Sequence, residues 1–154
     1  MRRISNPMKN ILKTADAHCD GPCGVYDPAS ARIAGEAVQS MTKKMVALGD
    51  ETQDGAKGEA WYLNTMSRYV AIKEEEAQKC KDELLVLWTD YFKPTHLESN
   101  PEIHNIFWNA AKLCSACKVE VSVVHCQELM DAIEEIHHMF WATKGKEVPW
   151  IRAS

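Results

Sequence analysis

The sequence of 154 residues has no long apolar segment, no excess of positive charge and few segments that favour β-strands. No stretch approaches the roughly 20 apolar residues of a membrane-spanning helix, so we do not expect an integral membrane protein. The formal net charge of −4 argues against a general nucleic-acid-binding protein, because such proteins present a basic surface. Apolar residues make up 45% and charged residues 26%, a balance that predicts one globular domain with a substantial core.

The cysteine content excludes another class of protein. Six cysteines in a chain of this length, rich in helix-forming residues, do not predict a small disulfide-bonded scaffold. Reduced thiols, some of them metal ligands, suit an intracellular protein, and we expect a cytoplasmic location. The cysteines are Cys19, Cys23, Cys80, Cys114, Cys117 and Cys126.

The first 17 residues differ in charge from the rest of the chain. They carry four basic residues and one acidic residue, a net charge of +3, whereas residues 18–154 have a net charge of −7. Ala15-Asp16-Ala17 resembles the cleavage site of a signal peptide, but no apolar segment of roughly 7–15 residues precedes it. We therefore favour a short propeptide over residues 1–17, cut by a dedicated protease. A disordered start is the simpler alternative.

Hydrophobic spacing predicts four helices. Asp27-Pro28 and Asn100-Pro101 are typical of helix starts, and Pro94 is expected to end the second helix. Residues 119–124 are rich in β-branched side chains, but we interpret them as the approach to the last helix rather than as a strand. The short connections favour an all-α, antiparallel up-down four-helix bundle. The predicted helices cover about residues 28–49, 59–92, 101–117 and a last segment, through residue 140, that ends before residue 145.

Residues 18–26, His-Cys-Asp-Gly-Pro-Cys-Gly-Val-Tyr, concentrate side chains that bind metals. Cys19 and Cys23 are four residues apart, so a hook-shaped turn, favoured by the glycines and proline, could bring both sulfurs onto one ion. Cleavage after Ala17 would give His18 a terminal amine beside its imidazole ring. Two nitrogens and two sulfurs then form a planar donor set, which suits Ni(II) or Cu(II) rather than tetrahedral zinc.

The pattern His-Cys-Asp-x-Pro-Cys-Gly-x-Tyr-Asp-Pro in residues 18–28 resembles the nickel hook of nickel-containing superoxide dismutases. Residues 86–94, Val-Leu-Trp-Thr-Asp-Tyr-Phe-Lys-Pro, and residues 140–144, Phe-Trp-x-Thr-Lys, are similar to the ends of that family's second and last helices. The resemblance implies a domain over residues 18–154. In that domain a metal-binding hook, residues 18–26, precedes a helical bundle over about residues 28–144.

The resemblance also implies a site and a reaction. One nickel ion per subunit would be bound by the amine and ring of His18, the amide nitrogen and sulfur of Cys19, and the sulfur of Cys23. Tyr26 and Tyr91 match two tyrosines near the family's site and are the expected catalytic side chains. Superoxide would be converted to hydrogen peroxide and oxygen as nickel alternates between divalent and trivalent states. The implied partners are other subunits of a homohexamer, the maturation protease and a possible nickel chaperone.

Two positions depart from the family's pattern. Ala34 stands where a glutamate that helps to hold the histidine ring is expected, and Glu76 stands where an arginine is expected. Both changes concern the support of the His18 ring, whose orientation depends on its hydrogen-bond partner. We hypothesise that Glu36 or Glu76 takes over that hydrogen bond.

Two other functions remain as alternatives. A non-catalytic helical bundle could hold zinc or copper with the same cysteines, and such a structural site would need no free amine at His18. A thiol redox protein using Cys19 and Cys23 is the least favoured, because the Cys-x-x-Cys spacing and the βαβ pattern are missing. Removal of residues 1–17 therefore discriminates the enzyme from the non-catalytic alternative.

Polar residues outside the hook have simpler interpretations. Cys114, Cys117, His125 and Cys126 form a nominal zinc set, but we interpret Cys114 and Cys117 as filling gaps in the bundle core. Residues 73–76, Lys-Glu-Glu-Glu, are interpreted as a solvated helix face.

Charge near the predicted site bears on its substrate. Superoxide is an anion, so the net charge of residues 18–154 would repel it. A local lysine such as Lys93 could reverse the field at the entrance. His96 and His104 have no clear partner in the sequence and are interpreted as surface or interface residues.

Overall fold

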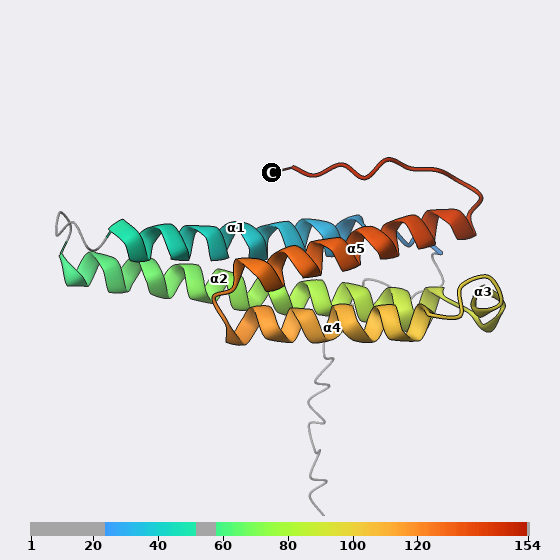
Figure 1. The fold of residues 1–154 in the computed structure, drawn as a ribbon, viewed down its shortest axis with the longest axis horizontal. Coiled ribbons are helices and arrows are strands. Elements are labelled where there is room, and N and C mark those ends of the chain that lie inside the picture. The colour runs from blue at the N-terminus through green and yellow to red at the C-terminus, as the bar shows by residue number, and fades with distance from the viewer. Residues whose placement is uncertain (1–23, 52–57, 154) are drawn as a thin grey trace, which may run out of the picture.

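The computed structural model describes residues 24–51 and 58–153, and within these ranges the protein is a bundle of helices without strands (Figure 1). Four long helices run alternately in opposite directions along the bundle. α1 and α4 each pack against both α2 and α5, so the four helices surround one core. The elements are α1 (Ala29–Glu51), α2 (Glu59–Val86), the π-helical turn η2 (Leu87–Tyr91), α3 (Pro94–Leu97), α4 (Ile103–Val119) and α5 (Val123–Thr143).

The predicted all-α bundle is therefore confirmed, and its antiparallel up-down order is visible in Figure 1. The hook expected in front of it lies largely outside the described residues. None of the helices in the described part of the chain is long and apolar enough to cross a membrane.

α1 begins where the sequence signals predict. The Asp27 carboxylate accepts a hydrogen bond from the backbone N–H of Ala29 at 2.8 Å, which satisfies one of the donors that a helix start leaves unpaired. Pro28 precedes the first helical residue, where a missing N–H costs nothing. Gly35 lets α1 approach α5 closely, because a Cβ atom at this position would lie 2.7 Å from Ile133 Cδ1. The tight α1–α5 contact is thus built into the sequence.

The second predicted helix is one continuous rod made of α2 and η2. Its last turn is π-helical, since Phe92 N donates to Leu87 O at 3.1 Å. The rod ends at Tyr91, just before Pro94 as predicted, and Lys93 is extended as a residue before proline should be. Pro94 also begins α3, a short helix that was not predicted. His96 Nδ1 accepts a hydrogen bond from Lys93 N at 3.1 Å and so caps the start of α3. The π-helical turn and α3 together shape the end of the bundle.

The connection between α4 and α5 is short and contains no strand. α5 begins at Val123, and Ser122 Oγ accepts a hydrogen bond from His125 N at 3.2 Å. The β-branched residues 119–124 therefore lead into a capped helix, which confirms that interpretation.

The interpretation of residues 73–76 as a solvated face is wrong for Lys73. Its residue surface is 2% exposed, and its ammonium donates to the backbone oxygens of Cys117 (2.7 Å), Lys118 (3.0 Å) and Glu120 (2.8 Å). These carbonyls lie at the end of α4, where no following helical turn can satisfy them. A cation from α2 fills that need and also interacts favourably with the negative end of the α4 dipole.

The segment after α5 was not predicted to be ordered against the bundle. It runs back past α5 and α1 in Figure 1. Ala153 N donates to Glu36 Oε2 at 2.7 Å, and the Arg152 guanidinium hydrogen-bonds Gln39. His137 Nε2 donates to Val148 O at 2.9 Å. Hydrogen bonds from α1 and α5 thus fasten this segment.

Candidate metal centre and its cavity

A cavity of about 440 Å³ opens at the end of the bundle where α1 begins and the α2 rod ends. Three segments supply its walls: the chain before α1, the end of η2, and the turn around α3. Its described lining residues are Gly24, Tyr26, Asp90, Tyr91, Lys93 and His96.

Gly24 is the lining residue that comes first in the chain. Its φ of 67° lies in the left-handed region, which residues with side chains rarely adopt. Among the residues that the structure describes, no atom would lie within 4 Å of an added Cβ, so backbone conformation rather than space requires glycine here. The residue before it is Cys23, one of the three predicted ligands.

Tyr91 is anchored to α5. Its hydroxyl oxygen lies 2.5 Å from Thr143 Oγ1, and the Thr143 hydroxyl itself donates to Phe140 O at 2.6 Å. A threonine hydroxyl has one proton, so Tyr91 must be the donor in the first contact. The Tyr91 and Phe140 rings lie 4.5 Å apart between centroids, which fixes the ring as well as the hydroxyl.

The structure brings the two predicted tyrosines together. The ring centroids of Tyr26 and Tyr91 are 5.5 Å apart, with the planes tilted by 54°. His96 stacks on Tyr91 at 5.7 Å between centroids, so Tyr91 is in contact with both rings. Sequence reasoning missed His96 as a lining residue. The signal available was its position three residues after Lys93 in a proline-initiated turn, where such a side chain caps the turn.

Two lysines lie close to the aromatic rings that line the cavity. Lys93 lines the cavity, and Lys144 Nζ lies 5.4 Å from the Tyr91 ring centroid and 4.6 Å from that of Phe140. Asp90 is the one carboxylate among the described lining residues. Two lysines near the cavity produce a local field that favours a small anion, although the chain as a whole carries a net charge of −4.

The predicted ligands His18, Cys19 and Cys23 lie outside the described residues, as does the propeptide predicted over residues 1–17. Within residues 24–51 and 58–153, no three His, Cys, Asp or Glu side chains are grouped as metal ligands.

The cysteines of the nominal zinc set do not converge on one point, because Cys117 pairs with Cys126 and Cys114 pairs with Cys80. Cys117 Sγ lies 3.8 Å from Cys126 Sγ, whereas Cys114 is hydrogen-bonded to Cys80. His125 Nδ1 faces the Glu120 carboxylate at 3.2 Å. All four of these cysteines are buried in the core.

The two candidates for support of the His18 ring have different surroundings. Glu36 is buried, and its two carboxylate oxygens accept hydrogen bonds from Arg32 Nη1 at 2.6 Å and from Ala153 N at 2.7 Å. Glu76 is half-buried and has Lys79 at 3.9 Å. Glu36 is the more firmly held of the two carboxylates, and the hydrogen bond of either one to the His18 ring stays a prediction.

Comparison with known proteins gives consistent matches. The profile of the nickel-containing superoxide dismutase family matches residues 13–144. The nickel superoxide dismutase of Streptomyces seoulensis is 44% identical over 128 residues, which cover 83% of this chain and 88% of that protein. The enzyme of Streptomyces coelicolor is 40% identical over 131 residues, 85% of this chain and 91% of that one. The chain also matches a crystal structure of a nickel-containing superoxide dismutase with nickel ligation corresponding to the oxidized state. The TM-score is 0.71 at 41% identity, and the match covers 84% of this chain and 100% of that chain.

Proposed function

This chain belongs to the nickel-containing superoxide dismutase family, and we propose that it binds its nickel through His18, Cys19 and Cys23 beside the cavity that begins at Gly24. It is a superoxide dismutase that uses nickel, an oxidoreductase that converts superoxide to hydrogen peroxide and oxygen. One observation carries the assignment of the ligands: the chain passes directly from Cys23 into the cavity wall at Gly24.

The donor set fits the metal. Two thiolates, an amine and a deprotonated amide are strong donors, and a planar set of nitrogen and sulfur suits Ni(II) better than Zn(II). Nickel bound there supplies the one-electron chemistry by alternating between the divalent and trivalent states. Family membership also favours the enzyme over the non-catalytic zinc- or copper-binding alternative. Zinc in addition has no redox chemistry.

The residues of the cavity attract superoxide, position it and supply a proton to the peroxide that forms. Lys93 draws the superoxide anion toward the opening, against the repulsion of the chain's net negative charge. Tyr26, three residues after Cys23, presents a phenol that positions superoxide and holds a proton for the forming peroxide. Tyr91 acts as a positioning residue, because its own hydroxyl proton is donated to Thr143 and its ring supports Tyr26.

Maturation is part of the proposal. Residues 1–17 form a propeptide, and cleavage before His18 creates the terminal amine that the donor set needs. An amide nitrogen at that position cannot coordinate as an amine does, so the uncut chain should be inactive. A dedicated protease and a nickel chaperone are the implied partners, in the cytoplasm.

The test compares three forms loaded with nickel: the chain starting at His18, the full-length chain, and a form with one extra residue before His18. Electron paramagnetic resonance, elemental analysis and dismutase activity are measured on each. We expect equimolar nickel, a rhombic signal split by one axial nitrogen, and activity in the first form alone. Dismutase activity in a nickel-loaded chain that is demonstrably full length would refute the proposed amine ligand.

We also propose that the enzyme assembles as a homohexamer, as its family resemblance implies. Leu63 and Val70, one heptad apart on α2, are 56% and 37% exposed, and apolar side chains exposed on one face of a helix are typical of a subunit interface. Sedimentation analysis of the form starting at His18 tests the assembly. A monomer at micromolar concentration would contradict it.

A further inference from the structure

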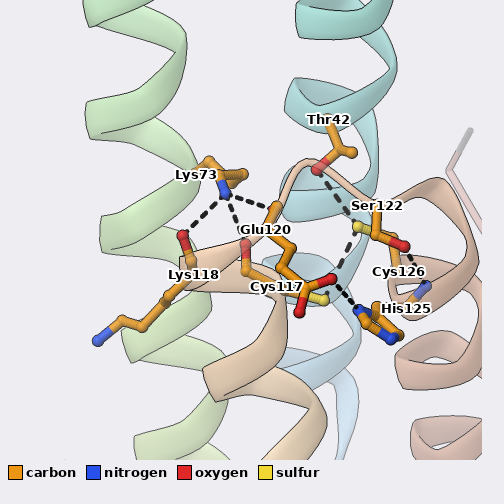
Figure 2. Close-up of polar contacts among 8 residues, drawn as sticks. All are labelled: Thr42, Lys73, Cys117, Lys118, Glu120, Ser122, His125 and Cys126. Atoms are coloured by element: carbon orange, nitrogen blue, oxygen red, sulfur yellow. Dashed lines mark hydrogen bonds and ion pairs between the residues drawn. The ribbon is translucent and has the colours of Figure 1, made fainter.

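A pair of buried thiols lies at the junction of α4 and α5 (Figure 2). Cys117, in the last turn of α4, and Cys126, near the start of α5, face each other with their sulfurs 3.8 Å apart. Their exposed fractions are 0% and 1%. A disulfide bond is about 2.05 Å long, so the two sulfurs need to approach each other by roughly 1.8 Å. Small side-chain rotations and slight adjustments of the helix ends can supply such a movement.

The surroundings of Cys126 favour its thiolate. Its sulfur lies 3.2 Å from Thr42 Oγ1, and the Lys73 ammonium lies nearby on α2 (Figure 2). The hydrogen bond from the Cys117 thiol, then the hydrogen bond between Cys126 and Thr42 and the charge of Lys73, lower the pKa of Cys126 to about 6, although burial acts in the opposite direction. The His125 charge acts in the same sense, and His125 is itself paired with the Glu120 carboxylate.

Cys117 is the complementary partner. Its hydrogen bond to Cys126 and its burial raise its pKa above the ordinary value of a thiol, so it keeps its proton. The pair therefore shares one proton, with the negative charge on the sulfur closest to the start of α5, where the helix dipole favours an anion. One thiolate beside one thiol is the arrangement from which a disulfide forms by two successive displacements.

The chain contains a second thiol pair that serves as an internal reference. Cys80 and Cys114 are also fully buried and hydrogen-bonded to each other. Their hydrogen bond, their burial and the negative charge of Glu83 all raise the pKa of Cys80. The two pairs thus share burial and proximity but differ in electrostatics.

We propose that Cys117 and Cys126 are a peroxide-oxidisable pair, which the hydrogen peroxide produced by dismutation converts to a disulfide that joins α4 to α5. The Cys126 thiolate attacks one oxygen of the peroxide, the O–O bond breaks, and a sulfenic acid forms while hydroxide leaves and takes up a proton. The Cys117 sulfur then attacks Cys126, the S–S bond forms, and the S–O bond breaks with release of a second water. Two thiols lose two electrons, and one peroxide is reduced to two waters.

Peroxide reaches the pair through the α4–α5 connector. Residues 120–122 connect α4 to α5 next to the two sulfurs (Figure 2), and Val121 in this connector is 51% exposed. Helix ends open locally at small cost in free energy, and peroxide is little larger than water. The simpler interpretation, that the two thiols only fill the core and stay reduced, makes the opposite prediction for the same experiment.

The experiment adds hydrogen peroxide in steps to the reduced full-length chain, blocks the remaining thiols after unfolding, and maps the tryptic peptides by mass. Trypsin leaves both hook cysteines on peptide 14–32, so their oxidation is recorded separately. A disulfide between Cys117 and Cys126 links peptides 113–118 and 119–144, and fragmentation distinguishes Cys117 from Cys114 on the first of them. Because peroxide is added directly, the result does not depend on nickel binding or on activity.

We expect the link to form at doses that leave Cys80 and Cys114 fully alkylatable. Cys126→Ala should leave Cys117 reduced at the same dose, whereas Cys114→Ala should leave the link intact. The proposal is overturned if Cys117 and Cys126 remain thiols at doses that oxidise exposed methionines, or if Cys80 and Cys114 link as readily. Mapping of the unmodified chain decides between these outcomes even if a variant fails to fold.

Discussion

Replacement of Lys73 by methionine would test how the α4–α5 junction is held together. Methionine keeps most of the side-chain volume of lysine, so the change removes the ammonium without opening a large cavity. Three backbone oxygens, those of Cys117, Lys118 and Glu120, would lose a donor at 2.7–3.0 Å. We therefore expect the cost to appear as lost hydrogen bonding rather than as lost packing.

The magnitude follows from two opposing terms. A hydrogen bond from a charged donor contributes about 1.5–3 kcal/mol, so three bonds amount to roughly 5–9 kcal/mol. The substitution also removes the penalty for burying a charge, which is several kcal/mol, and the carbonyls at a helix end regain some water. We expect a net loss of about 2–4 kcal/mol in the free energy of unfolding, which lowers the urea midpoint by about 1–2 M.

Urea unfolding followed by circular dichroism measures this loss, and Lys79→Met is the matched control. Lys79 lies on the same helix with a side chain that is 55% exposed and a long contact of 3.9 Å to Glu76. Its replacement should cost less than about 0.5 kcal/mol. A Lys73→Met chain as stable as the control would show that water satisfies the end of α4, and the capping argument would then be wrong.

Three further changes probe the cavity and the thiol pair. Lys93→Glu should lower kcat/KM for superoxide several-fold, with a deficit that shrinks as salt is added; stopped-flow measurements with no salt dependence would contradict the steering role. Tyr91→Phe removes the hydrogen bond donated to Thr143 and should cost about 1 kcal/mol in thermal or urea unfolding; unchanged stability would mean that this contact is not made. The ultraviolet absorbance of a thiolate should titrate near pH 6 in the parent chain and not in Cys126→Ala. Because the pKa of Cys126 is lower in the folded chain than in the unfolded one, its stabilising contribution is complete above about pH 8.5. It declines as the pH falls and is lost below about pH 6, and a stability difference between the two chains that is constant over this range would refute the assignment.

Local chemistry in the sequence was sufficient to predict the four long helices. Asp27-Pro28 and the hydrophobic spacing define α1 through contacts between near neighbours, and such contacts are readable from the chain alone. The segment 146–153 was not predictable in this way. Its partners Glu36 and Gln39 are more than a hundred residues distant in sequence, and no periodicity marks it.

The candidate site was predicted unevenly for a related reason. The hook and the tyrosines were identified by resemblance to a family, and the structure brings the rings of Tyr26 and Tyr91 together. His96 was missed because its contact with Tyr91 depends on the unpredicted turn at α3. Lys73 was misread because a run of charges does not reveal which member faces the end of another helix.

The length of α4 separates the cavity proposed for the enzyme's reaction from the Cys117–Cys126 pair. η2 helps to line the cavity and packs against α4. The thiol pair lies at the far end of α4 (Figure 1). The 17 residues of this helix span roughly 25 Å. A peroxide molecule released at the cavity mixes with the solution before it meets a sulfur at that distance. The pair would therefore report the average peroxide concentration around many enzyme molecules and not the turnover of its own subunit. In one solution, a chain without nickel should be oxidised as fast as a chain that carries it.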